Sequence, residues 1–200
     1  MSNSAPEGKS SLPVGKLFIL SGPSGSGKST VIAQALADPS LPVRLAISAT
    51  TRPPRPKEID GQHYHFWTPE QFENGIRAGQ FLEWADVYGH RYGTLKSEVE
   101  PFLQKGQSVL LEVDVQGGMQ ISKVHPEAVL VFIQTSSLEE YEKRLRSRRT
   151  DNEASMQKRL ASARQELQTG AKHYQHHIVN DDLNQAVAKL KEIMHSHIGA

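Results

Sequence analysis

The sequence predicts an α/β protein, in which a mainly parallel sheet is flanked by helices and one smaller lobe is inserted. Two observations predict this fold class. Short apolar runs typical of strands alternate with helical patterns along most of the 200 residues. One stretch between the second and third expected strands breaks that alternation, which indicates an insertion.

The regular part of the chain supplies strands and crossover helices in turn. The first strand is expected at the apolar run 17–21, and the others follow at 44–48, 108–114, 128–134 and 177–180. Each has a helical pattern nearby that can connect parallel neighbours. The expected helices are 28–37, 95–105, 116–125, 138–149, 152–169 and 183–197.

The irregular part begins with a proline-rich loop after residue 49. It continues with the alternating pattern of residues 62–67, a short helical pattern at 69–78 and a strand-like run at 81–87. We interpret this stretch as a lobe inserted beside the main sheet. The chain has no internal repeat.

Composition excludes several classes of protein. Lys and Arg total 23 against 22 Asp and Glu, so no global field favours nucleic acid or an anionic membrane as a partner. Cysteine is absent, which excludes disulfides and thiolate chemistry and fits a cytoplasmic location. No apolar run has the length of a membrane helix. Residues 1–14 lack the apolar centre of a secretion signal and are expected to form a disordered tail.

A phosphate-binding loop follows the first expected strand directly. The residues complete the pattern G-x-x-x-x-G-K-[ST], whose glycines let backbone N–H groups turn inward beneath a helix N-terminus. Lys28 can reach the β- and γ-phosphates, and the Ser29 hydroxyl can ligate a magnesium ion. This placement predicts a P-loop NTPase-type fold that binds ATP through Gly22, Pro23, Ser24, Gly25, Ser26, Gly27, Lys28, Ser29 and Thr30.

A second anion site is predicted in the proline-rich loop that opens the lobe. Its prolines favour an extended path of about three residues per turn, which places Arg52 and Arg55 on one side, roughly 9 Å apart. Two guanidinium groups at that spacing suit a phosphate between them. The alternative is a solvated basic loop tethered by prolines.

Several motifs in order give the chain a family resemblance. From about residue 16 to 193 it resembles guanylate kinases. The resemblance rests on the phosphate loop and on the segments SATTRPPR (48–55), GQHYHF (61–66), FLEWA (81–85), YGT (92–94), LEVDVQG (111–117) and IVNDD (178–182). The resemblance implies that ATP and Mg²⁺ bind the phosphate loop and that GMP binds the inserted lobe.

The resemblance also assigns side chains to the acceptor nucleotide. In the family, the residues at the matching positions bind the GMP phosphate. In this chain those positions carry two cations and three hydroxyl groups: Ser48, Arg52, Arg55, Tyr64 and Tyr92. Glu83 matches the carboxylate that accepts from the adjacent N1–H and N2–H₂ groups of guanine. Thr94 is expected to donate to guanine O6, and Glu112 to help hold the base. The alternatives are core aromatic, edge-strand and turn residues.

Two further residues are expected nearer the phosphoryl donor. Asp114 ends a buried strand, where an acidic residue orients magnesium or its waters, although it can equally cap the following helix. Asn180 matches a family position near the ATP base or ribose, with a plain turn as the alternative. Both assignments remain expectations from the resemblance and the strand position.

A basic helical segment follows the fourth strand of the sheet. Arg144 and Arg148 share a helix face at i, i+4. The resemblance implies a mobile lid whose arginines close over the transferred group, so Arg148, Arg144 and Arg159 are the expected catalytic cations, with Lys28. Arg149 replaces a glycine common in the family. A solvated basic face balanced by nearby glutamates is the alternative.

Together these expectations divide residues 15–197 into a core (15–47, 93–140 and 171–197), a GMP-binding lobe (48–92) and a lid (about 141–165). The implied reaction phosphorylates GMP, and also dGMP, at the expense of ATP. Two alternatives share the fold: a ribose 1,5-bisphosphate phosphokinase and a non-catalytic protein-binding module. A GTPase switch is weaker, because D-x-x-G at Asp114 is followed by no Asn-Lys-x-Asp motif. The sequence assigns no oligomeric state.

Overall fold

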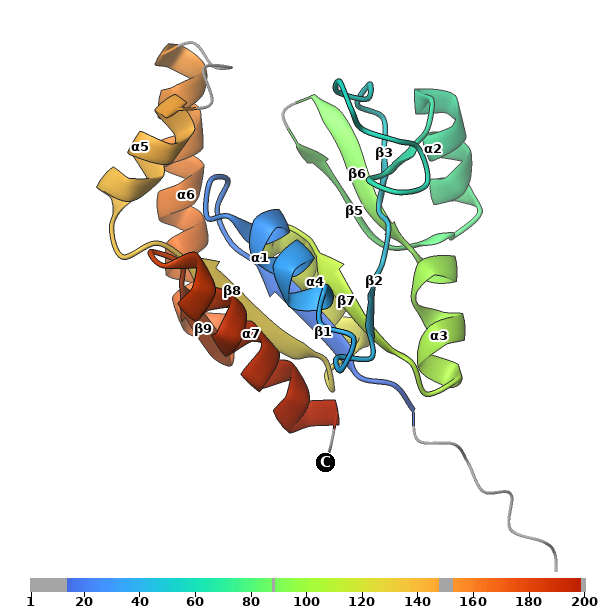
Figure 1. Ribbon diagram of the computed structural model, residues 1–200. Helices are drawn as coiled ribbons and strands as arrows, with labels where there is room; N and C mark the ends of the chain where they lie inside the picture. Colours follow the sequence, from blue (N-terminus) through green and yellow to red (C-terminus); the bar gives the residue numbers. More distant parts are fainter. Residues whose placement is uncertain (1–13, 88, 148–152, 199–200) are drawn as a thin grey trace, which may run out of the picture.

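The computed structural model describes residues 14–87, 89–147 and 153–198 (Figure 1). Nearly all of the predicted tail, Arg148 and Arg149 lie outside this part of the chain. No helix within the described ranges is both long and apolar enough to cross a membrane.

A five-stranded parallel sheet forms the centre of the molecule, as predicted. Its spatial order is β2-β7-β1-β8-β9, and every neighbouring pair runs parallel. The strand β1 lies in the middle and is buried on both faces, which explains its continuous apolar run. The strand bounds are β1 Leu17–Ser21, β2 Val43–Leu45, β7 Ser108–Glu112, β8 Val129–Gln134 and β9 His176–Val179.

Helices cover both faces of this sheet (Figure 1). On one face α1 (Lys28–Leu36) and α7 (Leu183–Ile198) cover Phe18 and Leu20 of β1, and Met194 of α7 is buried in the same cluster. The other face is covered by α3 (Glu100–Gln104), α4 (Val115–Val124) and the end of α6 (Glu153–His173). A smaller cluster, formed by Tyr141, Leu145, Met156 and Leu160, joins α6 to α5 (Leu138–Ser147).

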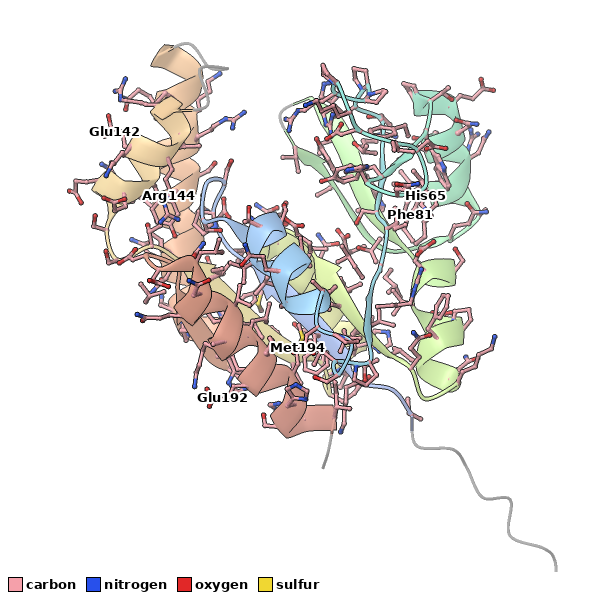
Figure 2. The ribbon with its side chains drawn as sticks, viewed as in Figure 1. His65, Phe81, Glu142, Arg144, Glu192 and Met194 are labelled. Atoms are coloured by element: carbon pink, nitrogen blue, oxygen red, sulfur yellow. The ribbon has the colours of Figure 1, made fainter. Side chains whose placement is uncertain are left out.

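The inserted lobe has its own small sheet and core. Its strand order is β4-β3-β6-β5, with β6 antiparallel to both β3 and β5. Phe72 of the helix α2 (Pro69–Arg77) stacks on Phe81 at 4.5 Å between ring centroids, and Figure 2 labels Phe81 in the lobe. The strand bounds are β3 Ala49–Thr50, β4 His65–Phe66, β5 Phe81–Val87 and β6 His90–Leu95.

One ionic cluster ties this lobe to the core. Glu98 of the short 3₁₀ turn η1 (Lys96–Glu98) accepts from Arg44 of β2 at 2.8 Å. Its other carboxylate oxygen lies 3.1 Å from Nε2 of His65, on β4 of the lobe. The lobe is therefore anchored to the sheet edge through side chains as well as through the chain itself.

Several predicted boundaries were wrong for identifiable reasons. The helix expected at 95–105 is a 3₁₀ turn followed by α3, because Pro101 is tolerated only in the first turn of a helix. The strand expected at 44–48 ends at Leu45. The alternation at 62–67 forms only the two-residue strand β4, after a turn closed by Gly61 N–H donating to Tyr64 O.

The strands β3 and β6 carry no apolar alternation and were not predicted. Their residues pair across the lobe, with Ala49 opposite Gly93 and Thr50 opposite Tyr92. The core–lobe boundary drawn between residues 92 and 93 falls inside β6.

Candidate nucleotide site

The phosphate-binding loop connects β1 to α1, in the context that the sequence predicts. Gly25 and Gly27 have φ of 95° and 88°, in the left-handed region that favours glycine. The Lys28 ammonium folds back over the loop and donates to Gly22 O at 2.6 Å. The loop is therefore closed on itself, with its lysine held at the centre.

Asn180 supports this loop from the end of β9. It is 5 % exposed, and its amide Nδ2 donates to Ser26 O at 2.7 Å. A side chain at Gly27 would meet that same amide at 2.4 Å, so the glycine also leaves room for Asn180. Asn180 was predicted near the ATP base or ribose, and the contact described here is with the loop itself.

Two acidic residues lie at the carboxyl end of β7, beside the loop. Glu112 accepts from the Ser29 hydroxyl at 2.7 Å. Glu112 was expected to help hold guanine and Ser29 to ligate magnesium, and in this structure the two side chains contact each other. Asp114 caps α4, its Oδ1 accepting from Gly117 N–H at 2.7 Å. Of the two predicted roles of Asp114, the geometry shows the helix cap.

The basic loop of the lobe is organised by an acidic residue that sequence reasoning missed. Glu58 accepts from Arg52 through both carboxylate oxygens, at 2.8 and 3.0 Å, and from Arg55 N–H at 2.7 Å. These bonds to Arg52, and then the Arg55 amide, hold the pKa of Glu58 below its usual range despite partial burial. The sequence offered one sign of this role, which is a carboxylate three residues after Arg55.

The two arginines of this loop therefore differ. The Arg52 side chain is 10 % exposed, its Nε donates to the Tyr92 hydroxyl at 3.2 Å, and its guanidinium lies over the ring of Tyr64. Arg55 is exposed and lines the cavity. The two guanidinium groups, expected to have a phosphate between them, occupy different environments in this structure.

Glu83 is the buried carboxylate of the lobe. It is 7 % exposed, and its Oε1 accepts from the Thr94 N–H at 3.0 Å and from the Thr94 hydroxyl at 2.7 Å. Burial, with the nearby charge of Asp114, raises the pKa of Glu83 to about 7, although the Thr94 bonds act in the opposite direction. Thr94, expected to reach guanine O6, here orients Glu83.

Helices α5 and α6 bring cations to the other side of the site. Arg159 lines the cavity, with Nη1 3.5 Å from Ser24 Oγ. Arg144 of α5, labelled in Figure 2, donates to Asn180 O at 2.7 Å. Arg148, the first expected lid cation, lies outside the described residues.

Glu166 of α6 is a second residue that sequence reasoning missed. It lines the same cavity, and burial raises its pKa to about 7, while the charge of Lys28 lowers it and that of Asp114 raises it. Its helix is rich in charged and polar residues, so nothing in the pattern separates Glu166 from solvent-facing positions.

One cavity of about 770 Å³ joins these parts, within the range typical of small-molecule sites. Of the predicted residues that the structure describes, Pro23, Ser26, Arg52, Thr94, Arg144 and Asn180 are not in its lining. The predicted residues that line it are Gly22, Ser24, Gly25, Gly27, Lys28, Ser29, Thr30, Ser48, Arg55, Tyr64, Glu83, Tyr92, Glu112, Asp114 and Arg159.

The chain is similar to proteins of one family over most of its length. A family model described as guanylate kinase matches residues 14–197. A guanylate kinase from Fusobacterium nucleatum is 47% identical over 187 residues, 94% of this chain and 100% of that protein. One from Rubrobacter xylanophilus is 45% identical over 90% of this chain and 93% of its own. The solved guanylate kinase of Anaplasma phagocytophilum superposes with a TM-score of 0.78 at 28% identity, covering 94% of this chain and 88% of its own.

Proposed function

Because the chain belongs to the guanylate kinase family, we propose that it transfers the γ-phosphoryl group of ATP to GMP, and also to dGMP, giving ADP and the diphosphate. One observation carries the proposal. A single cavity is lined by most of the phosphate-binding loop, including Lys28 and Ser29, and by the buried carboxylate Glu83 with the hydroxyl-bearing Tyr64 and Tyr92. Phosphoryl donor and acceptor sites therefore open into the same space.

The phosphoryl donor binds at the loop between β1 and α1. The backbone N–H groups and the N-terminus of α1 provide a site for the β- and γ-phosphates. Lys28 exchanges its bond to Gly22 O for a phosphate oxygen, which moves the ammonium without moving the loop. Asn180 keeps the loop in place during that exchange, through its bond to Ser26 O.

The acceptor phosphate binds where the lobe faces this loop. Arg55, Ser48, Tyr64 and Tyr92 all line the cavity and can donate to a dianion. Arg52 contributes from behind, because it holds the Tyr92 hydroxyl while Glu58 fixes its guanidinium. The second pKa of a phosphate monoester is about 6, so the acceptor oxygen is already ionised and no general base is required.

Base recognition rests on Glu83. An ionised carboxylate accepts from the two adjacent N–H donors of guanine, a pair that adenine lacks. Because burial raises the pKa of Glu83 to about 7, the free site holds a mixture of acid and carboxylate near neutral pH. Guanine binding favours the carboxylate, whereas AMP would offer it no matching pair of donors.

Catalysis then consists of alignment and charge neutralisation. Lys28 and Arg159 face the cavity from the loop and from α6, and Arg144 and Arg148 belong to the segment proposed as the lid. Closing this segment over the cavity would exclude water and limit wasteful hydrolysis of ATP.

The side chains near the loop fit a magnesium ion. Ser29, Glu112 and Asp114 offer hard oxygen ligands at the carboxyl end of β7. No group of three or more acidic or histidine side chains in the described ranges forms a ready-made cage. Magnesium needs none, because it usually keeps several waters and takes the rest of its ligands from substrate phosphates. Ser29 and Asp114 would hold the ion, which neutralises charge on the β- and γ-phosphate oxygens.

Both alternatives within this fold fit less well. A sugar-phosphate acceptor has no use for a buried carboxylate with the environment of Glu83. A protein-binding module needs neither Lys28 nor Ser29, and both are intact and face the cavity. We place the enzyme in the cytoplasm, where its nucleotide substrates are, with no nucleic acid or membrane partner.

The test is a coupled ADP-release assay with magnesium-ATP and one acceptor at a time: GMP, dGMP, AMP, UMP or ribose 1,5-bisphosphate. Turnover on the two guanine nucleotides alone is expected. Turnover on the sugar phosphate would overturn the role of Glu83, and a folded wild type that turns over none of them would favour the binding module.

A further inference from the structure

Gly117, in the first turn of α4, occupies a position where a side chain has no room. Its backbone is helical, so conformation alone does not require glycine there. A Cβ at this position would lie 2.8 Å from Glu83 Oε2 and 3.1 Å from Glu83 Cδ. The volume of the missing methyl group is thus occupied by the carboxylate proposed to read the base.

The Glu83 carboxylate is fixed from two sides. On the lobe side, Oε1 accepts both the N–H and the hydroxyl of Thr94 on β6. On the core side, Oε2 lies against the first turn of α4, whose N–H groups carry partial positive charge. Thr94 and Gly117 therefore belong to different layers of the molecule and meet at one side chain.

A methyl group at position 117 would have to displace this carboxylate. Cβ atoms essentially never lie within 3.0 Å of a non-bonded heavy atom, and the neighbour here is the anchored end of a buried side chain. Glu83 cannot swing away without losing a bond from Thr94. The displacement is transmitted into the cavity that Glu83 lines.

We propose that Gly117 is a positioning residue for acceptor recognition, whose missing side chain sets the depth at which Glu83 meets the base. The inference rests on the proposed function and adds to it a specificity-determining position on the core. The neighbouring Gly118 has a different role, because a Cβ there would meet Tyr174 Oη and Ser21 Oγ and not Glu83.

The experiment compares steady-state KM values for GMP and ATP in wild type, Gly117→Ala, Glu83→Asp and the double variant. Ser122→Ala is the matched control, since Ser122 lies on the same helix and its hydroxyl donates to Met119 O. Gly117→Ala is expected to raise the KM for GMP about tenfold or more, with the KM for ATP changed less than about twofold. Ser122→Ala should leave both near wild type.

The double variant decides whether the effect passes through Glu83. Shortening the side chain by one methylene makes room, so the KM of the double variant should lie at least about threefold below the product of the single effects. Three results would overturn the inference. They are KM effects of the two single variants that simply multiply in the double variant, an unchanged KM for GMP in Gly117→Ala, and equal rises in the KM values for GMP and ATP.

Folding gives a second readout. If Gly117→Ala does not fold, a folded double variant supports the clash with Glu83, and an unfolded one overturns it. A wild type that binds ATP but does not phosphorylate GMP would refute the proposed function, and this inference with it. That result is distinct from failure of the variants alone.

Discussion

The phosphoryl-donor and acceptor halves of the site are built in different ways. The donor half is nine consecutive residues whose backbone forms the site, supported from outside by Asn180. The acceptor half collects side chains from residues 48 to 94, on the strands β5 and β6 and on the segments that precede them, and two of these side chains are held by others. Arg52 depends on Glu58, and Glu83 depends on Thr94. A contiguous motif therefore describes the first half fully and the second half only in part.

Removing the central cation of the donor half should have the largest effect. Lys28→Ala is expected to lower kcat by about 10³-fold, because the phosphate-binding loop loses the ammonium group that neutralises charge on the β- and γ-phosphates. The coupled assay with GMP measures it. Lys189→Ala, which removes an exposed lysine paired with Glu192 on α7, is the control and should retain wild-type rates.

Removing the charge of Glu83 should weaken GMP binding without affecting ATP binding. Glu83→Gln is expected to raise the KM for GMP about 100-fold with the KM for ATP unchanged, because the amide cannot accept from both guanine donors. Since the pKa of Glu83 is raised to about 7, wild-type kcat/KM for GMP should also rise from about pH 6 to about pH 8, more steeply than in the variant. Parallel pH profiles for the two proteins would contradict this role.

Removing the support of Arg52 tests how far the acceptor half depends on side chains that do not contact the substrate. Glu58→Gln should raise the KM for GMP about tenfold, because Arg52 loses its bidentate partner while its own charge remains. Glu70→Gln, an exposed change on α2 of the same lobe, is the matched control. If Glu58 instead competes with the acceptor phosphate for Arg52, the KM will fall, and the supporting role is wrong.

The smallest effect concerns stability. The pKa of Glu166 is raised from 4.5 to about 7 in the folded protein, so its contribution to stability is fully present below 4.5 and is lost as pH rises through 7. Glu166→Gln should therefore stabilise the protein at pH 8 relative to pH 5, by on the order of 1 kcal/mol, or about 2–4 °C in Tm. Thermal unfolding at both pH values measures it, with the exposed Glu192→Gln as reference. An equal shift at both pH values would show that Glu166 does not titrate in this range.

The parallel sheet, its helices and the donor loop were predictable because their signals are local. The run at β1 is apolar since both faces are covered, and Gly25 and Gly27 are required by their own backbone angles. The strands β3 and β6 gave no such signal, because their pairing partners rather than their composition make them strands.

The residue types of the site can be read from the sequence: a phosphate loop, two arginines, hydroxyl groups and a carboxylate proposed to bind guanine. Their partners depend on how the chain folds. It placed Glu112 on Ser29, turned Thr94 toward Glu83, engaged Arg52 with Glu58 and brought Glu166 from α6 into the cavity. The physical reason is that hydrogen bonds and desolvation depend on distance in space, and residues 29 and 112, or 83 and 117, become neighbours only when sheet, lobe and helices have packed.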